Sequence, residues 1–151
     1  MKLNEVAFSH AEIQSSNGAI EAFRVTGDDF EAETVNGRIY IDGDLKEVEA
    51  ESVNGNVAVT TTSDEAHKLK ARTVAGSVEL YVPKTVAIDG QVSSNFGKTD
   101  VTLSDVVLHD EEDQFLLKTV HFDKSLPDAK LLKVVGESRT GTVIVRYSSY
   151  E

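Results

Sequence analysis

The motif ETVNGRI at residues 33–39 recurs as ESVNGNV at 51–57 and as RTVAGSV at 72–78. When the glycine of the motif is taken as the reference point, related glycines stand at Gly18, Gly37, Gly55, Gly76, Gly97 and Gly141. The gaps between them are 19, 18, 21, 21 and 44 residues, and the last gap is close to two ordinary periods. A period of about twenty residues is typical of stacked structural repeats.

The residues around each glycine alternate between apolar and polar. Apolar residues stand two and four places after it, as Ile39 and Ile41 do after Gly37, and polar residues lie between them. In three repeats an alanine stands five places before the glycine, with charged residues on both sides: Ala32, Ala50 and Ala71. Each period therefore predicts two short strands, each with one buried face, joined by a tight turn.

Units of this kind, stacked in parallel, predict an all-β, single-domain parallel β-solenoid (β-helix-like) of about six short coils. Neighbouring coils would lie about 4.8 Å apart. Right-handed coiling is expected because parallel crossover connections are right-handed in nearly all proteins. A flattened coil of about twenty residues is filled by its own side chains, so we expect a packed core inside the solenoid and no ligand tunnel.

The Asn-Gly pairs predict the corners of the coils, because both residue types tolerate positive φ. The corner residues are Asn17, Gly18, Asn36, Gly37, Asn54, Gly55, Gly76, Gly97 and Gly141. Stacked asparagine amides can form a ladder, and the hydroxyls of Thr34, Ser52 and Thr73 can bond the backbone at the same corner. A binding ladder is the alternative, but Ala75 replaces asparagine without breaking the repeat, which favours a structural role.

The repeat is regular over about residues 11–104 and then loosens. We expect an irregular insertion or cap over about 105–131, in which QFLLKTVHF (114–122) predicts a strand and KSLPDAK (124–130) a turn. A closing strand should follow over 132–147. Little sequence before residue 11 could cover the first coil, and an uncapped end exposes a strand edge. Either KLNEVAF (2–8) forms a short capping strand or the chain belongs to a longer protein. We expect the second, with residues 1–151 as one domain in the C-terminal part of that protein.

The charge of the chain limits its partners. It carries 26 acidic and 15 basic residues, a formal net charge of −11. Such a surface repels phosphate backbones and anionic lipids, so we expect no nucleic-acid partner and no direct membrane insertion. We find no signal-peptide pattern and no run of eighteen apolar residues, so we expect the cytoplasm over the cell surface. The absence of cysteine excludes disulfides and does not decide the compartment.

Residues with catalytic potential form no recognisable motif. The four histidines lack the spacing of a zinc site, and no carboxylate pair stands out as an acid and a nucleophile. We therefore predict no catalytic residue and no cofactor. The one metal candidate is a weak Ca²⁺ site at Asp28, Asp42 and Asp44, since stacked loops can bring oxygen ligands together. Conformational use of Asp in turns is the competing explanation.

The order of the motifs resembles a known bacterial family. The stretches that carry the resemblance are EAETVNGRI, EAESVNGNV, ARTVAGSVELYVPK, VSSNFGKTDVTLSDV and ESRTGTVIVRY, which span most of residues 11–147. They are similar to the domain of unknown function labelled "putative adhesin", or toastrack domain, and to the C-terminal region of YvlB-like proteins. The resemblance implies a β-solenoid-like fold, a place in a longer protein and an association with cell-envelope stress systems. It supplies no catalytic residues.

Three functions are compatible with these patterns. The first is a non-enzymatic interaction or scaffold module, which binds a protein partner or its own copies through sheet faces or strand edges. Charge columns such as Glu33, Glu51 and Arg72 would give such a face its register. The second is an adhesin-like module that binds cell-wall polysaccharide or a host surface, and the third a carbohydrate-active enzyme. Sugars stack on flat rings, and Tyr40 and Tyr81 are the only tyrosines in the repeats, which favours the first function.

Overall fold

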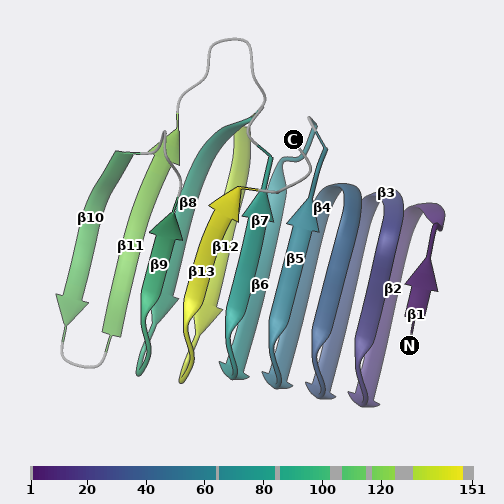
Figure 1. The fold of residues 1–151 in the computed structure, drawn as a ribbon, viewed down its shortest axis with the longest axis horizontal. Coiled ribbons are helices and arrows are strands. Elements are labelled where there is room, and N and C mark those ends of the chain that lie inside the picture. The colour runs from purple at the N-terminus through teal and green to yellow at the C-terminus, as the bar shows by residue number, and fades with distance from the viewer. Residues whose placement is uncertain are drawn as a thin grey trace.

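A computed structural model of the chain describes residues 2–63, 65–83, 86–102, 107–114, 117–124 and 131–147. Thirteen strands occupy these residues: β1 (Lys2–Asn4), β2 (Ala7–Asn17), β3 (Ile20–Asn36), β4 (Ile39–Asn54), β5 (Val57–Thr61), β6 (Lys68–Ala75), β7 (Val78–Val82), β8 (Ala87–Ser94), β9 (Thr99–Thr102), β10 (Val107–Gln114), β11 (Leu117–Lys124), β12 (Leu131–Ser138) and β13 (Val143–Tyr147). The fold is an all-β, single-domain parallel β-solenoid, as the repeat predicts (Figure 1).

The coils stack into two layers. We call the layer formed by β1, the first parts of β3 and β4, β5, β7, β13 and β9 the front sheet. The back sheet contains β2, the second parts of β3 and β4, β6, β12, β8, β11 and β10. β3 and β4 are long strands that bend from one layer into the other, and the tight corners between consecutive coils lie along the lower edge of Figure 1.

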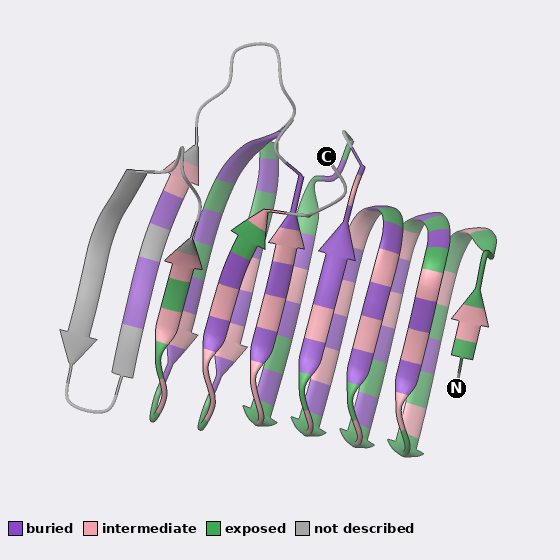
Figure 2. Ribbon diagram, viewed as in Figure 1, coloured by how far each residue is buried: buried purple, intermediate pink, exposed green. Residues whose placement is uncertain are grey.

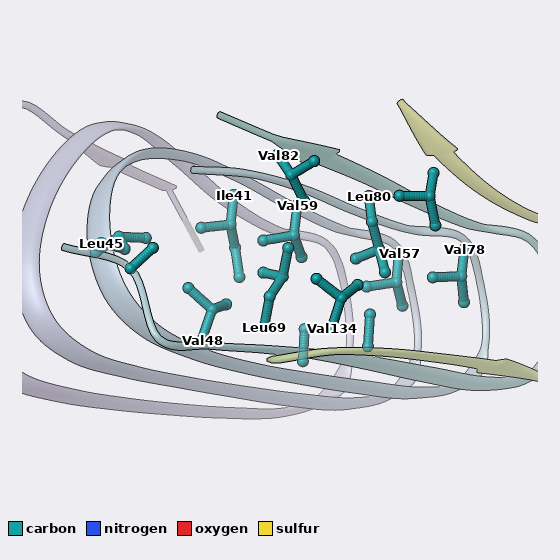
Figure 3. Packing of buried hydrophobic residues seen from close by; sticks show 14 of the residues in the cluster. Ile41, Leu45, Val48, Val57, Val59, Leu69, Val78, Leu80, Val82 and Val134 are labelled. Carbon is teal, nitrogen blue, oxygen red and sulfur yellow. The ribbon is translucent and has the colours of Figure 1, made fainter. Parts of the chain in front are cut away.

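The inward face of each strand carries the apolar half of the alternation, and this part of the prediction is confirmed. Ile39 pairs in register with Ile20 on one side and with Val57 on the other, and all three are at most 1% exposed. Figure 2 shows the resulting bands of buried and half-buried residues along every coil, and Figure 3 shows the inward side chains meeting between the layers. Each such side chain stabilises the fold by roughly 1.5–3 kcal/mol.

The stacking order departs from the chain order at one place. β12 lies in the back sheet between β6 and β8, and β13 lies in the front sheet between β7 and β9. The last described strands therefore form a coil in the middle of the stack (Figure 1). They fit there because they carry the same inward alternation and the same corner as the coils on both sides, with Val143 opposite both Val78 and Thr99.

An antiparallel hairpin extends the far end of the back sheet. β11 pairs antiparallel with β8, and β10 pairs antiparallel with β11. The strand expected over 114–122 corresponds to β11, which begins at Leu117 and ends at Lys124. The turn expected over 124–130 lies outside the described residues, apart from Lys124.

Candidate interaction surface

The corners are held together by the backbone of their neighbours. At Gly55, φ is +155°, and the carbonyl oxygen of Gly37 occupies the place where a Cβ atom would stand. The carbonyl oxygen of Gly18 lies against Gly37 in the same way. The same contact joins Gly55 to Gly76, Gly76 to Gly141, and Gly141 to Gly97. The six glycines thus form one ladder in spatial order, and Gly141 takes the fifth place in it, ahead of Gly97.

Side chains add two further ladders at these corners. The amide of Asn36 donates to Asn17 Oδ1, and that of Asn54 donates to Asn36 Oδ1, each at 2.9 Å. Hydroxyls three places before five of the six corner glycines donate to the glycine carbonyl of the preceding coil in space, at 2.7–3.3 Å: Thr34, Ser52, Thr73, Ser138 and Ser94. The corner residues therefore supply hydrogen-bond partners to one another from coil to coil, as expected of residues that stabilise the stack.

A groove of about 830 Å³ runs along the outer side of the back sheet beside the corners. Its apolar part consists of Val35, Val53 and Val74, which stand two places before successive corner glycines and are 47%, 42% and 42% exposed. We call these three residues the valine stripe. The valine stripe was not among the predicted surfaces, although an outward position that should be polar is valine in all three copies of the opening motif.

The N-terminal half of the back sheet presents an acidic outer face, which we call the acidic field. Its members lie on β2, β3 and β4: Glu12, Asp29, Glu31, Glu33, Glu47, Glu49 and Glu51. The strand register sets carboxylates directly opposite carboxylates, so that Glu31 lies between Glu12 and Glu49. The columns of charge that the sequence predicts are therefore present on this face, with Arg72 opposite Glu51 on β6.

Cations reach the margins of the acidic field and leave its centre uncompensated. On β6, Lys68 and Lys70 lie 3.4 and 3.5 Å from the Glu49 carboxylate. His67 contacts Glu47, and His10 Nδ1 lies 2.9 Å from Asp29 Oδ2. Among the residues that the structure describes, no cation contacts Glu31 or Glu33.

Two of the three aspartates proposed as Ca²⁺ ligands, Asp28 and Asp44, line one hollow where the coils pass from one sheet to the other. Asp28 Oδ1 binds Lys46 Nζ at 3.1 Å, and Glu65 binds the same ammonium at 3.3 Å. Hydrogen bonds to Asp28 and then Glu65 raise the pKa of Lys46 above its ordinary value. Asp44 lines the same hollow, whereas Asp42 lies in the front sheet opposite Phe23.

The three aspartates therefore do not surround one point. Within the described ranges, no group of three histidine, aspartate or glutamate side chains is placed to hold a metal ion. The chain turns from one sheet to the other between Asp42 and Asp44, and Lys46 already supplies a positive charge beside Asp28.

Aromatic side chains on the front sheet form one pair. The rings of Phe23 and Tyr40 lie 5.1 Å apart at 36°, and the ammonium of Lys2 lies 5.5 Å from the Phe23 ring centre. Tyr81 lies on another coil, where its hydroxyl donates to Glu79 Oε2 at 3.4 Å. Burial and then the charge of Glu79 raise the pKa of Tyr81.

Comparison with known proteins places this geometry among proteins without an assigned activity. The chain is similar in sequence to an uncharacterized protein. This is YvlB of Bacillus subtilis (strain 168), with 30% identity over 106 residues, which are 70% of this chain and 29% of YvlB. The chain thus spans less than a third of the length of that relative, and no protein-family model matches it.

A solved structure shares the fold. It is "a putative cell adhesion protein" from Clostridium sporogenes ATCC 15579, which superimposes with a TM-score of 0.62 over 97% of this chain and 92% of its own. At 11% identity the match establishes the likeness of the fold alone. The sequence similarity agrees with a YvlB-type domain of unknown function. Among the elements described, no helix has the length and apolarity needed to cross a membrane.

Proposed function

We propose that this chain is a non-enzymatic interaction module that binds a positively charged partner protein through the acidic field. The observation that carries the proposal is the stacking of Glu31 between Glu12 and Glu49. Like charges directly opposite each other in a sheet are destabilising. A fold that needs only polar outward residues gains nothing from this arrangement, whereas a cationic partner would relieve it.

The acidic field suits recognition because the β-solenoid holds it rigid. Its side chains project from paired strands whose inner faces are buried, so their spacing of about 4.8 Å from coil to coil is fixed before binding. A complementary surface then pays little ordering entropy, and the negative field raises the rate of encounter. The name of the structural neighbour, "a putative cell adhesion protein", is consistent with an interaction role.

An adhesin-like module that binds wall polysaccharide is the second candidate. The observation that favours it is the contact between Phe23 and Tyr40 on the outer face of the front sheet, since sugars pack against aromatic rings. The two candidates use opposite faces of the molecule, so substitutions on one face separate them.

Co-sedimentation with cell walls of Bacillus subtilis tests both candidates. Walls that retain their proteins are compared with walls stripped of protein, over a range of salt. The double variant Glu12→Gln/Glu31→Gln should bind protein-bearing walls at least about tenfold more weakly than the unmodified chain. The control Glu21→Gln/Glu79→Gln removes the same charge from the front sheet and should bind normally.

Two results would overturn the interaction proposal. Equal binding by both double variants would show that the acidic field is not involved. Binding to protein-free walls that survives in Glu12→Gln/Glu31→Gln and is lost in Phe23→Ser would assign the function to polysaccharide recognition by the front sheet.

A further inference from the structure

The valine stripe identifies a second feature that the fold itself does not require. Three large apolar side chains stand half-exposed in line on a chain with a net charge of −11. Exposed apolar residues that adjoin one another and are bordered by polar groups mark binding surfaces more often than scattered ones do. The inner face of the same strands is filled by other residues, such as Ala32 and Ala50, so the valines add nothing to the core.

The stripe continues beyond the three valines. The next coil in space contributes Arg139, which lines the groove and whose aliphatic stem can extend an apolar surface. On the coil of β8 the equivalent place is held by Asn95, which also lines the groove and whose backbone N–H donates to the carbonyl of Ser138 at 3.3 Å. From Val35 to Asn95 the groove crosses four coil steps, or about 19 Å.

This spacing matches an α-helix better than an extended peptide. Side chains on one face of a helix recur every three or four residues, an axial rise of about 4.5–6 Å. Those on one face of a strand recur every two residues, about 6.6 Å. The coils present one valine about every 4.8 Å, so successive turns of a helix would meet successive coils. A groove of about 19 Å accommodates roughly thirteen helical residues.

The charge along the groove indicates which residues such a helix should carry beside its apolar ridge. Glu33 and Glu51 line the groove beside the valines. Glu51 is shared with Arg72, 3.6 Å away, and Arg72 Nε also binds Glu137 Oε2 at 2.8 Å, so the groove keeps a net negative charge. A helix with lysine or arginine next to its apolar ridge would complement it.

We infer that the groove beside the corners binds an amphipathic, basic α-helix of a partner protein, with its apolar ridge on the valine stripe. This deepens the proposed function, because it rests on the same back sheet and names the partner's chemistry. Valine supplies no flat ring for a sugar to stack on, so the groove favours a polypeptide over a polysaccharide.

A synthetic helix tests the inference directly. The probe is a fluorescent eighteen-residue peptide with leucine at i, i+3, i+4 and i+7 positions and lysine on both sides of them, titrated with the intact chain. Val53→Ser/Val74→Ser should weaken its binding at least about tenfold, equivalent to about 1.4 kcal/mol. The control is Val6→Ser/Leu131→Ser, which removes two side chains that are 38% and 48% exposed outside the groove and should leave the affinity within twofold.

The outcomes separate this inference from the proposed function. Equal affinity of the two double variants for the peptide would overturn the groove assignment, and so would equally tight binding of a peptide with serine for leucine. Binding of protein-free walls, lost on Val53→Ser/Val74→Ser without any binding of the peptide, would overturn it in favour of a saccharide. Neither Glu12 nor Glu31 lines the groove, so a loss of wall binding confined to their variant would leave the proposed function standing while the helix site fails.

Discussion

Replacing Glu31 with glutamine should stabilise the folded chain. Glu31 is half-buried on β3, has Glu12 and Glu49 directly opposite on the two neighbouring strands, and contacts no cation within the part of the chain that the structure describes. Glutamine has almost the same shape and can still form hydrogen bonds with water. The substitution therefore removes the like-charge repulsion and leaves the packing of the coil unchanged.

The size of the effect follows from the strand spacing. Two unit charges about 5 Å apart in water repel by about 0.8 kcal/mol. At physiological ionic strength, screening reduces each term by roughly half. Lys68 and Lys70 partly neutralise Glu49, so the two neighbours together should contribute about 0.5 kcal/mol at physiological salt and about 1 kcal/mol at low salt.

Urea unfolding followed by circular dichroism, at low and at physiological salt, measures this difference. Glu137→Gln is the matched control, because it removes the same charge but breaks the ion pair with Arg72 and should lower the free energy of unfolding by about 0.2–1 kcal/mol. If both substitutions raised the stability equally, the effect would come from net charge alone. The acidic field would then have no local cost, and the main support of the proposed function would be lost.

Three further predictions concern the fold. Gly55→Ala should cost about 3 kcal/mol or more in urea unfolding, because the new Cβ would clash with the Gly37 carbonyl and the backbone has an unfavourable φ. At Gly18 an added Cβ makes only an ordinary contact with Ser15 Oγ at 3.8 Å, so Gly18→Ala should cost only about 1–2 kcal/mol; equal costs would contradict the corner ladder. Val57→Asp should cost about 4 kcal/mol or more, while Ala58→Lys on the outer face, opposite Glu79, should be nearly silent; similar losses of thermal stability would refute the alternation. Burial raises the pKa of the Tyr81 hydroxyl, so its contribution to stability is complete below the unfolded pKa near 10 and is lost as the pH rises through the folded pKa. In urea titrations the stability of the unmodified chain relative to Tyr81→Phe should therefore fall between pH 9 and 11. A constant difference over this range would contradict the prediction.

The repeat made most of the fold predictable, because the local sequence of each coil specifies which residues point inward and where the corner lies. Ile39 and Val57 stand at the same distance from their glycines, and their burial follows from that distance alone. The hydroxyl contacts of Thr34, Ser52 and Thr73 were likewise predictable, since equivalent residues in a solenoid occupy equivalent places.

The order of the coils was not predictable, for the same reason. Every coil carries the same inward alternation, so no local signal distinguishes a position beside β6 from one beyond β9. The interaction surface was predictable in part. The charge column through Glu51 follows from the period, and so does the repetition of valine in the stripe. The groove in which these valines lie depends on how the coils stack, which the period alone does not specify. The separation of Asp42 from Asp44 depends on where the chain bends between the sheets, which sequence spacing does not specify.

The place of β12 and β13 in the stack has a consequence for how the chain is made. Residues 131–147 are synthesised after every other described strand, yet their coil lies between β6 and β8 in the back sheet and between β7 and β9 in the front sheet. The coils therefore cannot pair in chain order during synthesis. One edge of β6 and one edge of β7 stay unpaired until strands about sixty residues downstream have been made. A nonsense mutation shortly before residue 131 would remove the coil that joins β6 and β7 to β8 and β9, and would not simply shorten the stack. Even a late truncation should therefore be as damaging as the loss of an interior repeat.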